Sequence, residues 1–162
     1  MAYFSGYNIS PLSEQIIENL LLYRGMTAKQ LTYLIDPFPT LSLEKSIYNY
    51  LRILKKQGLV VSYKLQENVS KGSLYFLTKS GYDLAKDIFN VEEGQTGSGW
   101  ISSEPGLQAD LADIPYETFK PPLKQSAHHL MLVNFFIQLK SIDVNNDWIN
   151  HRINLYAAFE YE

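Results

Sequence analysis

The chain has 162 residues and a formal net charge of −3, and its composition limits the class of protein. Hydrophobic residues make up 46% of it and aromatic residues 14%, which suffices for a folded core of one domain, or one small domain with an extension. Cysteine is absent, which excludes disulfides and thiolate metal sites. No apolar run is long enough to cross a bilayer, and residues 1–15 lack the features of a signal peptide. We therefore predict a cytoplasmic protein without a membrane segment.

The charge is distributed unevenly along the chain. Residues 1–90 contain ten Lys or Arg and seven Asp or Glu, a balance of +3. Residues 91–162 contain four and ten, a balance of −6. A negative total argues against a general polyanion binder, and the asymmetry indicates that only the first half meets nucleic acid.

Two helices are predicted before Pro37, the second of them short. Residues 1–10 are predicted to be a loose arm with three aromatic residues. A helix follows to about Tyr23, because Ser10 or Ser13 can cap it and Pro11 suits its first turn. Thr27 is predicted to cap the second helix, which ends before Pro37 because the residue before a proline avoids the helical region.

The third predicted helix, Ser42 to Gly58, is the segment around which the chain is organised. Its apolar face consists of Leu43, Ile47, Tyr50, Leu51 and Leu54. Its opposite face carries Lys45, Asn49, Arg52 and Lys56, flanked by Tyr48 and Lys55. An ordinary amphipathic helix with solvated lysines would show the same pattern. The segments on either side of this helix must therefore distinguish the two interpretations.

The segment after this helix favours a DNA-binding fold. Residues 59–65 and 73–77 are predicted to be the strands of a hairpin with a polar tip at 66–72. Thr78 is predicted to cap a fourth helix. Three helices, a β-hairpin and a further helix are the order of a winged helix-turn-helix, which is an α+β fold.

Two segments also resemble known families. LRILKKQGLVV at 51–61 and LTKSGYDLA at 77–85 resemble the L-x-x-L-x-x-x-G-L-V … L-T-x-x-G pattern of bacterial winged-helix regulators. SAHHLMLVNFFIQL at 126–139 resembles the H-x-L-x-V-N helix of plasmid replication-relaxation proteins. The resemblance implies a DNA-binding protein of a plasmid or related mobile element. Chains of that family commonly continue into a larger, nuclease-like domain, which is expected to be incomplete in this chain.

The second half of the chain is predicted to serve self-association. We divide the chain into a winged-helix domain at 1–90, a linker or ordered strap at 91–125, and a dimerisation element at 126–162. This last part comprises a helix and a strand at 152–161. The helix is apolar over most of its surface, which predicts burial on more than one side and hence a homodimer. The third helices of the two subunits, about one DNA turn apart, would then bind an inverted repeat.

Other chemistries are set aside. Asp143 to Asp147 begins like a calcium loop, but the positions that require glycine and glutamate carry other residues. His128 and His129 are adjacent on a helix and point about 100° apart, which favours a packed histidine over a metal site. Glycines at 94, 97 and 99 lack the context of a phosphate loop. We predict no catalytic residue, metal or cofactor, and no enzyme activity.

The predicted partner is double-stranded DNA. Lys45, Ser46, Asn49 and Arg52 are expected to face the major groove, since Asn and Arg make bidentate contacts with adenine and guanine. Tyr48 is expected beside them. Lys55, Lys56, Lys64 and Lys71 are expected to contact phosphate, the last from the tip of the hairpin. The alternative is a winged-helix protein-interaction or scaffold module without direct DNA contact.

Overall fold

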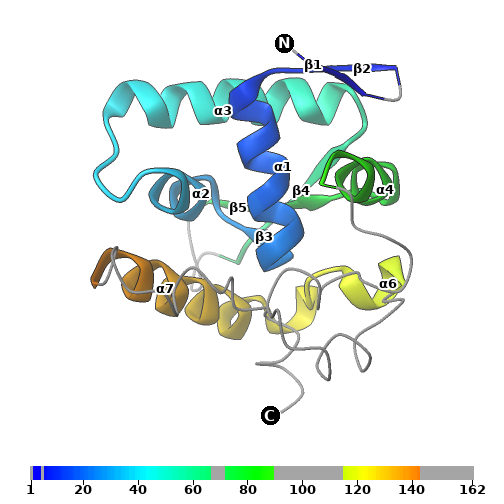
Figure 1. Ribbon diagram of the computed structural model, residues 1–162. Coiled ribbons are helices and arrows are strands. Elements are labelled where there is room, and N and C mark those ends of the chain that lie inside the picture. The colour runs from blue at the N-terminus through cyan, green and yellow to red at the C-terminus, as the bar shows by residue number, and fades with distance from the viewer. Residues whose placement is uncertain (1, 5, 67–71, 90–114, 143–162) are drawn as a thin grey trace, which may run out of the picture.

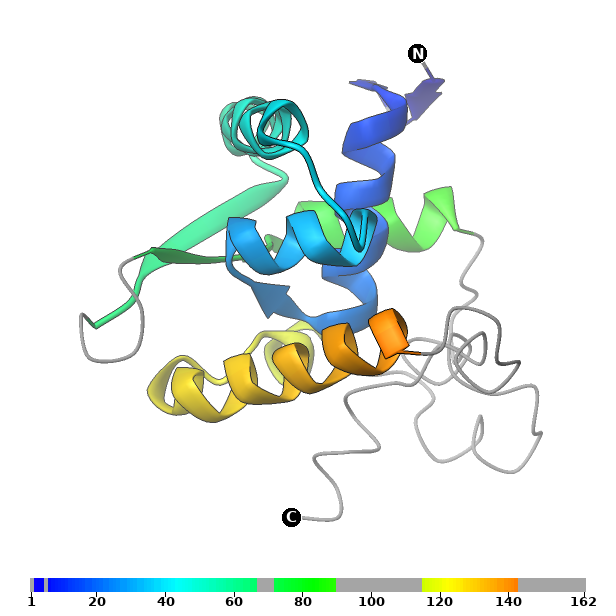
Figure 2. The same cartoon turned by 90° about the vertical axis from the view of Figure 1, so that its left-hand side faces the viewer.

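The computed structural model describes residues 2–4, 6–66, 72–89 and 115–142, with side chains up to 138, and these residues form an α+β fold. The elements in chain order are β1 (Ala2–Phe4), β2 (Tyr7–Ile9), α1 (Pro11–Tyr23), β3 (Gly25–Met26), α2 (Ala28–Ile35), α3 (Leu41–Lys56), β4 (Val60–Lys64), β5 (Ser73–Leu77), α4 (Lys79–Ile88), α6 (Tyr116–Phe119), the 3-10 helix η2 (Leu123–Gln125) and α7 (Ser126–Ile142). Helix α3 lies on one side of the molecule and α7 on the other, with α1, α2 and the three-stranded sheet between them (Figures 1 and 2).

Hydroxyl side chains fix where the helices begin. Ser10, Thr27 and Thr78 cap α1, α2 and α4 as predicted, because each hydroxyl accepts a hydrogen bond from the backbone N–H three residues later. The cap of α3 is Thr40, so this helix begins one residue before the predicted Ser42. Because such capping residues can be identified in the sequence, the starts of these helices could be predicted to within about one residue.

The sheet is antiparallel, with the strand order β3-β5-β4. Strands β4 and β5 lie within the predicted hairpin, and Ser62 is paired with Tyr75. Strand β3 was not predicted; its two residues pair with Tyr75 and Phe76 of β5. Because side chains alternate along a strand, Ser62 and Tyr75 share one face of the sheet, and Leu74 and Phe76 lie on the other. Figure 2 shows the hairpin strands starting below α3, which is seen end-on, and projecting outward from the molecule.

A close approach between α4 and the turn after α3 requires glycine. A Cβ atom at Gly81 would lie 2.0 Å from the carbonyl oxygen of Leu59, a separation that no side chain can tolerate. Thr78 reinforces the same junction, since its Oγ1 donates to the carbonyl of Gly58 at 2.7 Å. The Thr and Gly of the LTKSG motif thus both hold α4 against the end of α3.

The prediction that residues 1–10 form a loose arm is wrong. Strands β1 and β2 pair antiparallel, with Ala2 opposite Ile9. Gly6, at the turn between them, has a φ of +86°, which glycine adopts without strain. Ile9 is buried in the core and Tyr7 packs against it. Burial of the Ile9 side chain and packing of Tyr7 help to order this segment.

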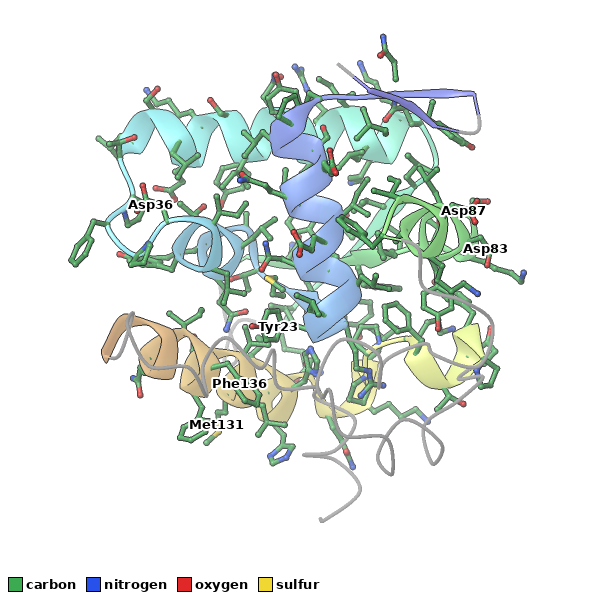
Figure 3. The ribbon with its side chains drawn as sticks, viewed as in Figure 1. Tyr23, Asp36, Asp83, Asp87, Met131 and Phe136 are labelled. Carbon is green, nitrogen blue, oxygen red and sulfur yellow. The ribbon has the colours of Figure 1, made fainter. Side chains whose placement is uncertain are left out.

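The C-terminal part of the described chain shares the core of the first part. Phe119, Val133 and Phe136 pack in the same cluster as the buried residues of α1, α2 and α3. Figure 3 shows Phe136 next to Tyr23, and their ring centroids are 6.0 Å apart. A second cluster, formed by Leu65, Leu74, Phe76 and Leu130, covers the hairpin on the face opposite Tyr75.

A buried arginine fastens the segment before α7 to the end of α1. The guanidinium of Arg24 donates hydrogen bonds to the carbonyls of Thr118, Phe119 and Lys120, at 2.6–3.0 Å. Residues 115–125 are therefore ordered against the core, as expected of a strap, while 91–114 lie outside the described residues. The predicted strand at 152–161 and the segment 143–147 also lie outside them. None of the described helices combines the length and apolarity needed to cross a bilayer.

Candidate nucleic-acid interface

Helix α3 separates apolar from polar side chains as the sequence predicts. Ile47, Leu51 and Leu54 are buried in the core. Leu43 and Tyr50 are partly buried and pack against the same cluster. The opposite side carries four exposed residues, which we call the outward stripe: Lys45, Asn49, Arg52 and Lys56. The core anchors the helix firmly enough to present this stripe to a partner.

A groove separates α3 from the sheet, and we call it the basic groove. Its volume is about 430 Å³, and the described residues lining it are Tyr48, Arg52, Lys55, Lys56 and Tyr75. Three of these residues are cationic and none is acidic. Four of them were predicted as DNA contacts, so the fold gathers these residues at one place on the surface.

Lys55 ties the helix to the hairpin across this groove. Its Nζ donates to Oγ of Ser62 on β4 at 2.8 Å. An ammonium group has three donors, so two remain after this bond is made. The bond holds the ammonium group at the wall of the groove, where its two remaining N–H groups can donate to an anionic partner.

The two tyrosines add neutral donors to the cationic side chains. Burial raises the pKa of the Tyr75 hydroxyl above its usual value of 10.0, and the neighbouring Tyr48 adds to this increase. The Tyr75 hydroxyl therefore keeps its proton at neutral pH and can donate it in a hydrogen bond. Sequence reasoning missed Tyr75, although its place opposite Ser62 in the hairpin register was the signal that could have found it.

Arg52 and Asn49 contact each other on the outward stripe. Nη2 of Arg52 donates to Oδ1 of Asn49 at 2.7 Å, one helical turn apart. Arg52 therefore belongs both to the outward stripe and to the lining of the basic groove. This contact was not predicted, because the sequence gives the spacing of the two residues but not their rotamers.

The remaining predicted contacts are more scattered. Lys45 is exposed on the outward stripe beyond the groove. Ser46 is partly buried and is not among the residues that line the groove. Lys64 is exposed at the end of β4, on the face of Ser62 and Tyr75. Lys71 lies outside the described residues. The predicted set therefore has a compact centre at the basic groove and less closely grouped members around it.

A second groove, between α2 and α7, has a different character. Its volume is about 420 Å³, and it is lined by Thr27, Lys29, Gln30, Tyr33, Leu130, Asn134, Ile137 and Gln138. Lys29 is its only charged lining residue among those described. The concentration of positive charge therefore distinguishes the groove beside α3.

One histidine of α7, His129, lies in the interior of the protein. His129 is fully buried, and its Nε2 lies 2.7 Å from the carbonyl oxygen of Gly25. Within the part of the chain that the structure describes, no group of three or more His, Asp or Glu side chains could hold a metal ion. Its burial and its contact with Gly25 make His129 part of the packing of α7 against β3.

Comparisons of this chain with protein-family models, with curated proteins and with solved structures find no match. The interpretation of the basic groove therefore depends on its own geometry and charge.

Proposed function

We propose that this chain is a winged-helix protein that binds double-stranded DNA through α3 and the β4–β5 hairpin. The basic groove carries the proposal, because it places three cations and two tyrosines between these elements. The major groove of B-DNA is about 12 Å wide and admits an α-helix, whose outward side chains then face the base edges. An exposed stripe opposite a well-buried face fits this role.

The chemistry of the side chains indicates which residues would contact phosphates and which would contact base edges. Lys55 and Lys56 are point charges in a groove that two tyrosines also line, which suits a phosphate oxygen more than a base edge. Lys64 on β4, and Lys71 in the segment of the chain between β4 and β5, would contact phosphates further along the duplex. Lys45, Asn49 and Arg52 lie on the outward stripe and would enter the major groove. Ser46 is partly buried, and its contribution would be smaller.

The biological role is proposed from the sequence resemblance. The segment 126–139 resembles plasmid replication-relaxation proteins, and 77–85 resembles bacterial winged-helix regulators. We therefore propose control of replication or transcription on a plasmid or other mobile element, in the cytoplasm. Specific binding would place the protein at an operator, where it would compete with or recruit the machinery that acts there.

A second candidate is a protein-interaction module without direct DNA contact. Two exposed apolar side chains favour it: Phe38, in the turn between α2 and α3, is 85% exposed, and Leu41, the first residue of α3, is 75% exposed. Asp36 orders this turn, because its carboxylate accepts a hydrogen bond from the backbone N–H of Phe38 at 2.9 Å. An exposed aromatic residue on an ordered turn suits the centre of a protein interface.

The test removes two charges from α3 and compares them with two charges elsewhere. Arg52→Ala/Lys56→Ala should weaken binding to a native plasmid duplex, with Arg52 alone costing about 1–3 kcal/mol at a cognate site. The matched control, Lys29→Ala/Lys124→Ala, removes two exposed cations outside the basic groove. Mobility shifts and thermal unfolding of all three proteins would be measured. Equal binding by the two double variants would refute the assignment to α3 and favour the interaction module.

A further inference from the structure

The outward stripe of α3 offers mainly hydrogen-bond donors. Lysine and arginine side chains donate and cannot accept. Asn49 is the only stripe residue with an acceptor, and its Oδ1 already receives a charge-assisted hydrogen bond from Arg52 at 2.7 Å. Arg52 uses one of the two lone pairs of this oxygen, and the amino group of Asn49 adds two further donors to the stripe. The stripe is therefore complementary to a base edge that carries acceptors.

Of the four bases, guanine has the edge that this stripe fits best. In the major groove guanine presents two acceptors, N7 and O6, which match the two-pronged guanidinium. Adenine and cytosine each present an amino group, which would face donors. Thymine presents a single acceptor beside a methyl group. A bidentate contact between Asn49 and adenine would need Oδ1 to accept from the adenine amino group while it also accepts from Arg52, which crowds two donor groups at one oxygen.

We propose that Arg52 reads a guanine in the major groove and that Asn49 is a positioning residue, which holds the guanidinium in its reading orientation. This inference rests on the proposed DNA-binding function and specifies the base at its centre. The contact also reduces the cost of binding, because one rotamer of a long side chain is already selected in the free protein.

The one carboxylate on α3 does not alter this assignment. Glu44 lies four residues before Tyr48, so a helix of 3.6 residues per turn places both on the flank beside the basic groove. Its side chain is partly buried, whereas Asn49 and Arg52 are exposed. The Glu44 carboxylate, which could accept a hydrogen bond from the amino group of cytosine, therefore lies outside the stripe.

The first measurement uses the full chain and unmodified residues. Binding sites would be selected from a random duplex library, and each guanine of the selected site would then be replaced by 7-deazaguanine, which lacks the N7 acceptor. We expect a shared guanine whose replacement lowers affinity about tenfold or more. Arg52→Lys should keep the salt dependence but lose the preference for guanine over adenine. Lysine keeps the positive charge but lacks the planar guanidinium that can donate two parallel hydrogen bonds.

The role of Asn49 is tested by the ratio of affinities for guanine and adenine at that position. Asn49→Ala should lower this ratio severalfold, because the guanidinium loses its support. Asn49→Asp keeps an acceptor for Arg52 and should keep the ratio, although its added negative charge weakens binding to every sequence. Lys45→Ala is the matched control on the same stripe, and it should lower all affinities alike without changing the ratio.

The possible results separate this inference from the proposed function. A wild-type protein that binds duplex DNA but selects no shared guanine, or ignores 7-deazaguanine, overturns the inference and leaves DNA binding intact. An Asn49→Ala variant with an unchanged ratio overturns the positioning role. Failure to bind any duplex at low salt overturns both proposals. The 7-deazaguanine measurement needs no variant, so it remains decisive even if a substitution disturbs folding.

Discussion

The docking of α7 should make the stability of this protein depend on pH through His129. Burial lowers the pKa of His129 to about 4 from its usual 6.5, and the neighbouring Arg24 guanidinium lowers it further, while the hydrogen bond to the carbonyl of Gly25 opposes the shift. The imidazole is therefore neutral in the folded protein at pH 7. A neutral ring with its proton on Nε2 can donate to the Gly25 oxygen, which lies 2.7 Å away.

The size and sign of the effect follow from proton linkage. Between pH 6.5 and pH 4 the unfolded chain binds a proton at this position that the folded chain does not bind, so stability falls as the pH falls. A difference of 2.5 pKa units between the usual value and that of the folded protein corresponds to about 3 kcal/mol in total. About 2 kcal/mol of this should be lost by pH 5.

The assay is urea unfolding at pH 7 and pH 5 for the wild type and His129→Gln. A glutamine amide can still donate to Gly25 but does not titrate, so the variant should lose about 2 kcal/mol less than the wild type on acidification. Identical pH dependence in the wild type and His129→Gln would refute the reasoning.

Three further predictions concern the core, the hairpin and α7. Gly81→Ala should destabilise the fold by at least about 2 kcal/mol in urea unfolding, since the new Cβ meets the Leu59 carbonyl at 2.0 Å; a smaller loss would mean that α4 shifts easily. Lys71→Ala should reduce the salt slope of DNA binding by about one unit, and an unchanged slope would place the hairpin tip away from DNA. Phe135→Glu, on an exposed part of α7, should convert a dimer to a monomer in sedimentation, whereas a monomeric wild type would remove the homodimer.

Helix α3 and the hairpin were predictable because their signals are local. The apolar residues of α3 recur at helical spacing, and Thr78 caps α4 three residues before the glycine it bonds. The hairpin strands differ from the predicted ranges by one residue at most. Each of these features depends on residues within a few positions of one another, so one sequence suffices to find them.

The features that the sequence did not reveal depend on distant partners. Strand β3 has only two residues, and its existence depends on pairing with β5, about fifty positions later. The first helix was predicted to end at about Tyr23, but its pattern does not show that the buried guanidinium of the next residue, Arg24, binds carbonyls of residues 118–120. Tyr75 joins the basic groove because α3 packs beside its face of the sheet. Charged residues are seldom buried without such partners, and no local pattern identifies the partner.

The surface of α7 is suited to contact a second copy of the chain. From Ser126 to Gln138 the helix has no charged residue, and two of its apolar side chains are largely exposed, Met131 at 68% and Phe135 at 54%. Figure 3 shows Met131 on the side of α7 away from Tyr23. Two copies of this surface could approach each other without like-charge repulsion, which a symmetric contact between charged helices would incur.

The position of α7 changes the DNA site that such a dimer is expected to bind. Helix α2 lies between α3 and α7 (Figures 1 and 2), and packed helix axes are about 8–10 Å apart. Two α3 helices joined through a pair of α7 helices would thus be roughly 40–50 Å apart, and any sideways offset increases this distance. One DNA turn is about 34–36 Å, so this distance lies between one turn and two.

A dimer through α7 is therefore expected to hold one duplex on each α3 helix, instead of reading the inverted repeat that the sequence suggested. The test mixes two duplexes with different fluorophores and measures their co-diffusion in the presence of the protein. Co-diffusion should appear with the wild type and disappear with Phe135→Glu, which should still bind each duplex singly. A dimer bound to one inverted repeat, with half-site centres about ten base pairs apart, would contradict this geometry.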